Sequence, residues 1–161
     1  MCGIIGISGH VDAEALKSGL SSLAHRGPDD SGIFIDEPAH IALGHRRLSI
    51  LDISPLGHQP MVGADGSVVL IFNGEIYNFR ELRAELEAKG FSFRGHSDTE
   101  VLLNLYLAEG EAMLSRLNGM FALAIWDKRK QSLLIARDAL GVKPLYYAAL
   151  NGCFAFASEI K

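Results

Sequence analysis

The sequence predicts an α+β protein, folded as a four-layer α/β/β/α sandwich of two antiparallel sheets. Short apolar runs of strand length cluster along the chain as antiparallel neighbours, and helical segments are inserted between those clusters. Several runs are continuously apolar, a pattern typical of strands that are buried on both faces. Two packed sheets with helices on their outer faces account for both patterns.

Eight apolar runs are the predicted strands. They span Cys2–Ile7, Ile33–Ile35, Ile41–Leu43, Val68–Phe72, Met120–Trp126, Ser132–Ala136, Leu145–Leu150 and Cys153–Ala157. The dipeptide Asn151-Gly152 separates the last two runs, and it favours the positive φ that both turn positions of a tight hairpin need. We therefore expect a hairpin there and a second hairpin around residues 128–131.

Three segments place apolar residues at helical spacing. The residues that share a face are Leu16, Leu20, Leu23 and Ala24 in the first segment, Leu82 and Leu86 in the second, and Val101, Leu102, Leu105 and Tyr106 in the third. Asn78 is the predicted N-cap of the second helix, with Glu81 completing a capping-box-like pair. Ser97 and Glu100 form the capping box predicted for the third. A shorter helix is expected over Glu111–Leu117.

Size, charge and composition exclude several classes of protein. The 161 residues fit one domain, and an apolar share of 48% supports an ordinary globular core. A net charge of -4, with Lys and Arg spread along the chain, argues against a nucleic-acid partner. The longest apolar run, Met120–Trp126, is too short to span a membrane and no leader-like segment opens the chain, so we expect no membrane partner and a cytoplasmic location.

Cysteine and histidine placement predicts neither a disulfide nor a metal site. The two cysteines, Cys2 and Cys153, are expected to stay reduced in a cytoplasmic protein. The six histidines lack the spacing of metal ligands, either on a helix or beside a cysteine.

Cys2 follows the initiator methionine directly. Removal of Met1 would place a thiol and a free α-amine on the same residue. An α-amine has a pKa near 8, so it is able to take the thiol proton close to neutral pH, directly or through a water. Cys2 is therefore a candidate nucleophile that carries its own base. The alternative is a buried, unreactive cysteine in an apolar run.

Asn73 and Gly74 follow one predicted strand and precede a predicted helix. We therefore expect them where the strand ends and the backbone turns. A side-chain amide beside an unshielded backbone N–H supplies the two donors that a developing oxyanion requires. The alternative is an ordinary Asn-Gly turn.

Charged residues near these segments are candidate ligands for a small zwitterion. Arg47 closes a predicted strand, where its guanidinium could bind a carboxylate in a bidentate manner, and Arg46 is equally suitable on chemistry alone. Asp98 begins the third helix, where it could bind an ammonium group or simply complement the helix dipole. Together with a thiolate and an oxyanion pair, these groups match the side-chain amide of a free α-amino acid. The loop Arg26–Gly32 could be no more than a connection.

Seven motifs, taken in order, resemble the glutaminase domain of glutamine-hydrolysing asparagine synthetases. They are Cys2-Gly3-Ile4, Arg26-Gly27-Pro28-Asp29, Arg47-Leu48-Ser49-Ile50, Asn73-Gly74-Glu75-Ile76-Tyr77-Asn78, Ser97-Asp98-Thr99-Glu100, Asn118-Gly119-Met120-Phe121-Ala122 and the run from Arg137 to Tyr147. The resemblance covers essentially the whole chain.

The resemblance implies an N-terminal-nucleophile hydrolase fold and class II glutamine amidotransferase chemistry. Glutamine would pass through a γ-glutamyl thioester to glutamate and ammonia, with no metal or cofactor. The implied site residues are Cys2 as nucleophile, its α-amine as base, Asn73 and Gly74 as the oxyanion hole, Arg47 rather than Arg46 for the substrate carboxylate, and Glu75 and Asp98 for the substrate's amino end.

The resemblance also sets expectations for domains and partners. Residues 1–161 would be a type-2 glutamine amidotransferase domain, the ammonia-supplying half of asparagine biosynthesis from aspartate. In the family, a synthetase domain that uses ATP and Mg²⁺ begins close to where this chain stops, and it would receive the ammonia. A different acceptor, a non-catalytic glutamine-binding or scaffolding module that retains Met1, and a homodimer are left open.

Overall fold

The computed structural model describes residues 1–50 and 52–160, and it confirms the predicted sandwich of two antiparallel sheets. In spatial order, the first sheet contains β2 (Asp30–Asp36), β3 (Ile41–Arg47), β1 (Gly3–Ser8), β9 (Cys153–Ala157) and β8 (Tyr146–Leu150). The second contains β4 (Met61–Val62), β5 (Val68–Ile76), β6 (Gly119–Asp127) and β7 (Ser132–Arg137).

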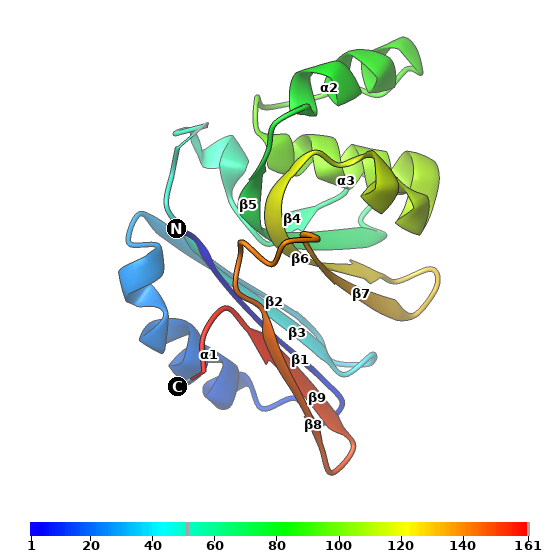
Figure 1. Cartoon of the computed structure of the whole chain (residues 1–161). Coiled ribbons are helices and arrows are strands. Elements are labelled where there is room, and N and C mark those ends of the chain that lie inside the picture. Colours follow the sequence, from blue (N-terminus) through cyan, green and yellow to red (C-terminus); the bar gives the residue numbers. More distant parts are fainter. Residues whose placement is uncertain (51, 161) are drawn as a thin grey trace.

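Helices cover the outer face of each sheet (Figure 1). Helix α1 (Ala13–Ser22) packs on β1 and β3, whereas α3 (Asp98–Glu109) packs on β5 and α2 (Phe79–Ala88) packs on α3. Short 3₁₀ helices η1 (Ala24–Arg26), η2 (Pro55–Gly57) and η3 (Gly110–Arg116) connect the larger elements. The predicted helix over Glu111–Leu117 is thus a 3₁₀ segment, and Ala24 lies in η1 beyond the end of α1.

Alternating side chains explain why the strands are apolar on both faces. Along β5, Val69 and Ile71 enter the core between the two sheets. Val68, Leu70 and Phe72 enter the separate core beneath α2 and α3. Because successive residues of a strand point to opposite faces, a sheet with helices on one side and a second sheet on the other needs apolar residues at every position.

The strand β5 extends four residues further than its apolar run predicts. It continues through Asn73, Gly74 and Glu75 to Ile76, paired with β6 along its whole length. Asn73 and Gly74 therefore lie within a strand, and the prediction that they sit beyond a strand end is wrong. A run of apolar residues stops at the first polar side chain, but backbone pairing does not depend on side-chain polarity.

Both predicted N-cap residues are confirmed, and Ser97 also caps through its side chain. The Ser97 hydroxyl accepts the Glu100 amide at 3.3 Å, as an N-cap does. The Glu100 carboxylate does not return to Ser97 as a capping box requires; it accepts the amides of Arg94 and Gly95, each at 2.8 Å. These two bonds fix the loop that leads into α3.

Asn78 is the N-cap residue of α2 as predicted, but its side chain makes no capping hydrogen bond. Its Nδ2 donates to the Arg116 carbonyl at 2.9 Å, and its Oδ1 accepts the Asn118 amide at 3.0 Å. The side chain thus joins the start of α2 to the segment that enters β6.

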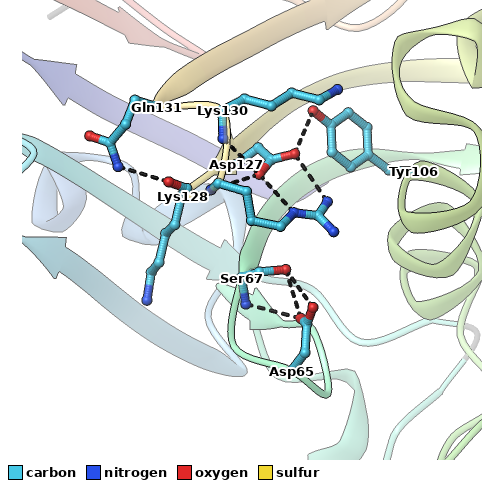
Figure 2. Close-up of polar contacts among 8 residues, drawn as sticks. Asp65, Ser67, Tyr106, Asp127, Lys128, Lys130 and Gln131 are labelled. Atoms are coloured by element: carbon cyan, nitrogen blue, oxygen red, sulfur yellow. Dashed lines mark hydrogen bonds and ion pairs between the residues drawn. The ribbon is translucent and has the colours of Figure 1, made fainter.

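Both predicted hairpins are confirmed. Asn151 and Gly152 adopt φ of 52° and 76° between β8 and β9. At the β6–β7 turn, the buried Asp127 carboxylate accepts the amides of Arg129 and Lys130, and it also binds the Arg129 guanidinium and the Tyr106 hydroxyl (Figure 2). Through Tyr106, Asp127 therefore joins this turn to α3. Asp127 and Gly119 are the two opposite ends of β6.

Candidate active site

The six predicted site residues line one cavity of about 110 Å³. The predicted residues on its wall are Cys2, Arg47, Asn73, Gly74, Glu75 and Asp98. They come from the start of β1, the end of β3, the second half of β5 and the start of α3.

The strand pleat places three of these side chains between the sheets. Cys2 shares a face with Ile4 of β1, and Arg47 shares a face with Leu43 of β3, because alternate residues of a strand point the same way. Ile4 and Leu43 both belong to the core between the sheets. Asn73 follows Val69 and Ile71 on the same face of β5. The cavity is therefore the polar end of the inter-sheet core.

The surroundings of the Cys2 thiol favour its protonated form. Its Sγ accepts the Leu48 amide at 3.4 Å and faces the Leu48 carbonyl at 3.7 Å. Burial raises the thiol pKa above its ordinary value, outweighing the hydrogen bond from Leu48 and the nearby positive charges. Among the hydrogen bonds of the described residues, none joins this sulfur to an imidazole or amine, so deprotonation requires a base from elsewhere.

Met1 is an exposed residue of the cavity wall, and its presence or removal decides whether the Cys2 nitrogen is basic. It is 56% exposed and lines the cavity, and its thioether accepts the Lys143 ammonium at 3.5 Å. While Met1 is attached, the Cys2 nitrogen is a peptide amide, which has no basic lone pair. A free α-amine on Cys2 requires the removal of Met1.

Asn73 presents a donor without a partner. The residue is 1% exposed, and its Nδ2 has no hydrogen-bond partner within the described chain. Leaving a buried donor unpaired costs about 1–3 kcal/mol, so such groups are rare in folded proteins. An unpaired amide on a cavity wall is suited to an acceptor that arrives with a ligand.

The Gly74 amide points to the cavity and not to β6. In an antiparallel pair, successive residues direct their N–H and C=O groups alternately to one neighbour and to the other. Phe121 is opposite Gly74 on β6, and it uses both its amide and its carbonyl on Asp138, the residue that follows β7. The backbone of Phe121 therefore does not pair with Gly74.

The neighbouring amides of the same alternation confirm this direction. The Phe72 amide donates to Gln59 Oε1 at 2.7 Å. The Ile76 amide donates to Asp98 Oδ2 at 3.1 Å. Gly74 lies midway between them, on the edge of β5 that β4 leaves uncovered. Its N–H is thus available beside the Asn73 amide, as an oxyanion hole requires.

Glycine is required at position 74 for a steric reason. A Cβ there would collide with the Met120 carbonyl and would lie 2.8 Å from the Phe121 Cα. Both contacts are backbone atoms of the paired strand, so they cannot move aside cheaply.

The structure distinguishes the two arginines. Arg47 lines the cavity, and its guanidinium donates to the backbone carbonyls of Ser54, at 2.9 Å, and Asp52. Gly57 leaves room for it, since a Cβ at that position would meet the guanidinium. Arg46 points to the opposite face of β3 and donates to the Leu20 carbonyl at 3.1 Å. Of these two arginines, Arg47 is the one placed to meet a ligand in the cavity.

Two carboxyl groups provide an acidic wall. Asp98 is 5% exposed, and burial raises its pKa to about 6, helped by the charge of Glu75 and opposed by backbone hydrogen bonds. Its bond to the Ile76 amide shows that it does more than complement the dipole of α3. A cationic group in the cavity would favour the charged form of Asp98.

Sequence reasoning missed Arg26, Lys143 and Gln59 as residues of the site. Arg26 donates to the Cys2 carbonyl at 2.9 Å, so the Arg26–Gly32 loop is more than a connection. Asp29 of the same loop, whose carboxylate accepts the Ser49 amide at 2.8 Å, is a structural anchor. Lys143 lines the cavity and is 7% exposed. The charges of Arg26 and Lys143 inside the motif runs were the available signal, whereas Gln59 lies in no such motif.

Residues 1–50 and 52–160 contain no group of three or more His, Cys, Asp or Glu side chains arranged to hold a metal ion. None of the helices in that part of the chain combines the length and the apolar character needed to cross a membrane.

Comparison with known proteins agrees with this site. The family model for the glutamine amidotransferase domain matches residues 1–161. Asparagine synthetase [glutamine-hydrolyzing] 1 of Bacillus subtilis is 48% identical over 100% of this chain, which covers 26% of that protein. Asparagine synthetase [glutamine-hydrolyzing] 2 of Arabidopsis thaliana is 42% identical, again over 100% of this chain and 28% of the relative. The chain thus spans about a quarter of the length of these relatives.

A solved structure supports the fold. Glutamine phosphoribosylpyrophosphate amidotransferase from B. subtilis, complexed with ADP and GMP, superposes with a TM-score of 0.81 at 28% identity. The match covers 98% of this chain and 42% of that one. The family match, the relatives and the shared fold confirm the resemblance drawn from the motifs: the chain belongs to the glutamine amidotransferase domain family, a family of enzymes.

Proposed function

We propose that this chain hydrolyses the side-chain amide of L-glutamine to glutamate and ammonia. One observation carries the proposal: a cysteine sulfur, two available N–H donors, a guanidinium and an acidic wall line a single cavity. These groups match the amide, the α-carboxylate and the α-ammonium of glutamine. Arg47 would bind the carboxylate, and Asp98 with Glu75 would bind the ammonium.

The first half-reaction forms a thioester on Cys2. After Met1 is removed, the Cys2 α-amine takes the thiol proton, and the sulfur attacks the amide carbon of glutamine. The carbonyl oxygen becomes an oxyanion that accepts the Asn73 side-chain amide and the Gly74 N–H. The C–N bond then breaks, the proton passes from the α-ammonium to the leaving nitrogen, and ammonia departs.

The second half-reaction releases glutamate. The α-amine takes a proton from water, and the resulting hydroxide attacks the thioester carbon, with the same two donors stabilising the oxyanion. The C–S bond breaks, and the proton returns to the sulfur. Water is consumed, no electrons are transferred overall, and every proton is carried by the chain or the substrate, so we propose that neither a metal nor a cofactor takes part in this reaction.

The ammonia acceptor is proposed to be a synthetase domain that makes asparagine from aspartate. Two of the relatives are named glutamine-hydrolysing asparagine synthetases, and the chain covers 26% and 28% of them. Individual exposed apolar side chains after β7 and near β8 are candidate contacts for such a domain. They are Leu140, Val142, Tyr146, Tyr147 and Ile160. A homodimer is the competing assembly, which sedimentation velocity of the purified chain detects. The proposed location is the cytoplasm.

The two cysteines provide a matched test. We expect the purified chain without Met1 to release glutamate from L-glutamine, to form a covalent adduct at Cys2 with a thiol-directed glutamine analogue, and to keep its activity after dialysis against EDTA. Cys2→Ala should abolish turnover with the fold retained, whereas Cys153→Ala should not change turnover. Glutamine binding without glutamate release by the Met1-free chain would instead favour the non-catalytic module.

A further inference from the structure

The edge of β5 that carries the oxyanion donors is held by side chains in place of a strand. The neighbouring strand β4 pairs with Val69 and Leu70 only, so the backbone groups from Phe72 onward on that edge have no strand partner. Unpaired backbone groups inside a protein must find other partners. The partners found here determine how the strand, and with it the oxyanion hole, is placed.

Phe72, the residue immediately before Asn73, is bonded through both of its backbone groups. Its amide donates to Gln59 Oε1 at 2.7 Å. Its carbonyl lies 3.1 Å from His45 Nε2. The Gln59 amide group is itself fixed, because its Nε2 donates to the Thr99 hydroxyl at 3.3 Å at the start of α3.

His45 is suited to this task by its position and its protonation. It is fully buried on the inner face of β3, two residues before Arg47, and it crosses from one sheet to the other. Burial lowers its pKa to about 4, so the ring is neutral near pH 7. A carbonyl only accepts hydrogen bonds, so the single ring proton is on Nε2 and is donated to Phe72. The Nδ1 atom then bears no proton, and it has no partner within the described chain.

We infer that His45 is a positioning residue for the oxyanion hole: its Nε2–H, acting on the Phe72 carbonyl across the two sheets, fixes the peptide that orients the Asn73 and Gly74 donors. The inference rests on the proposed glutamine hydrolysis. His45 does not line the cavity, so it does not touch glutamine. Its effect is confined to the tetrahedral intermediate and the transition states beside it, where the oxyanion exists.

Two amide variants separate this role from general stabilisation. In His45→Gln, the side-chain NH₂ reaches the place of Nε2, so the bond to Phe72 is retained. In His45→Asn, the NH₂ reaches only the place of Nδ1, and the bond is lost. Trp126→Phe is the control, because Trp126 Nε1 also joins the two sheets, to Asp36 at 3.0 Å, but away from the cavity.

We expect His45→Asn to lower kcat by about tenfold or more with KM unchanged, less than the roughly 10²–10³-fold loss that follows removal of an oxyanion donor. His45→Gln should retain most of kcat, and Trp126→Phe should lower the melting temperature with kcat unchanged. The γ-aldehyde of glutamate, which adds to Cys2 as a tetrahedral hemithioacetal, should bind His45→Asn more weakly by the factor seen in kcat. Binding of glutamate itself should not change.

Two results would overturn the inference. One is wild-type kcat and aldehyde affinity in folded His45→Asn. The other is an equal loss of kcat in His45→Asn and His45→Gln, which would show that the ring and not its Nε2–H matters. Failure of the unsubstituted, Met1-free chain to hydrolyse glutamine is a distinct outcome, and it would overturn the proposed function together with this inference.

Discussion

At the scale of single residues, the site combines groups that are unfavourable in the absence of a ligand. Burial raises the pKa of the Cys2 thiol, Asn73 Nδ2 has no partner among the described residues, and burial raises the pKa of Asp98 to about 6. Each of these costs folding free energy. A zwitterionic amide in the cavity would satisfy the donor and the carboxylate together, which is the expected pattern of a functional site.

Replacement of Asn73 tests the oxyanion assignment. Asn73→Ala removes one of two donors that act on the transition state, so kcat should fall by roughly 10²–10³ with KM for glutamine nearly unchanged. Steady-state glutamate release measures both quantities, and a thermal melt verifies the fold. A normal kcat in the folded variant would assign oxyanion stabilisation to other groups.

Asp98 makes glutamine binding and stability depend on pH in opposite ways. The glutamine ammonium binds the ionised carboxyl, so affinity should fall as pH drops below about 6. In the unliganded chain the folded state holds this proton more tightly than the unfolded state, whose pKa is near 3.8, so the contribution of Asp98 to unfolding free energy falls as pH rises from about 4 to 6.

Asp98→Asn should remove both effects. The amide oxygen is still able to accept the Ile76 N–H, but no charge forms, so KM for glutamine should be raised and lose its dependence on pH near 6. Calorimetric titration of glutamine between pH 5 and 8, with denaturant melts over the acidic range, measures the two slopes. Equal slopes in Asp98→Asn and in the unsubstituted chain would contradict the assignment.

At the scale of elements, β5 contributes both to the core and to the site. Its first half, from Val68 to Phe72, buries apolar residues on both faces of the sheet. Its second half places Asn73, Gly74 and Glu75 on the wall of the cavity. The apolar run predicted the first half. The second half was missed because pairing with β6 is a tertiary contact, and the side chains from Asn73 to Glu75 give no strand signal.

Gly74 matters both for the pairing of β5 with β6 and for the proposed oxyanion hole. Gly74→Ala should destabilise the fold by roughly 1–3 kcal/mol, since the new Cβ meets backbone atoms of β6, and it should lower kcat by displacing the amide. Gly63→Ala is the control, because a Cβ there makes only ordinary contacts of 3.4 Å or more. Denaturant melts and glutamate release compare the two variants. Equal tolerance of both would contradict the steric account.

At the scale of the whole molecule, the sandwich assembles the site from distant segments. The start of β1, the end of β3, the second half of β5 and the start of α3 meet at one end of the inter-sheet core. The layered architecture follows from apolar runs and helical spacing, and both hairpins follow from local turn chemistry. The proposed base is also readable locally, because a free α-amine on Cys2 depends only on the removal of Met1.

Other features depend on contacts across the fold. Arg46 and Arg47 are equally good candidates when only the sequence is known. The orientation of β3 in the sheet decides that Arg47 faces the cavity and Arg46 faces α1. Gln59 and His45 act through the backbone of Phe72, which lies 13 and 27 residues from them in the sequence. No local pattern reports such a bond, so these residues became visible only with the structure.

A comparison of the chain with and without Met1 tests most directly whether the Cys2 α-amine is the catalytic base. We would prepare the chain with and without Met1, verify each form by intact mass, and measure glutamate release from L-glutamine by both. We expect turnover by the Met1-free form alone, because only that form has a base beside a thiol whose pKa is raised by burial. Equal turnover by the form that retains Met1 would contradict it.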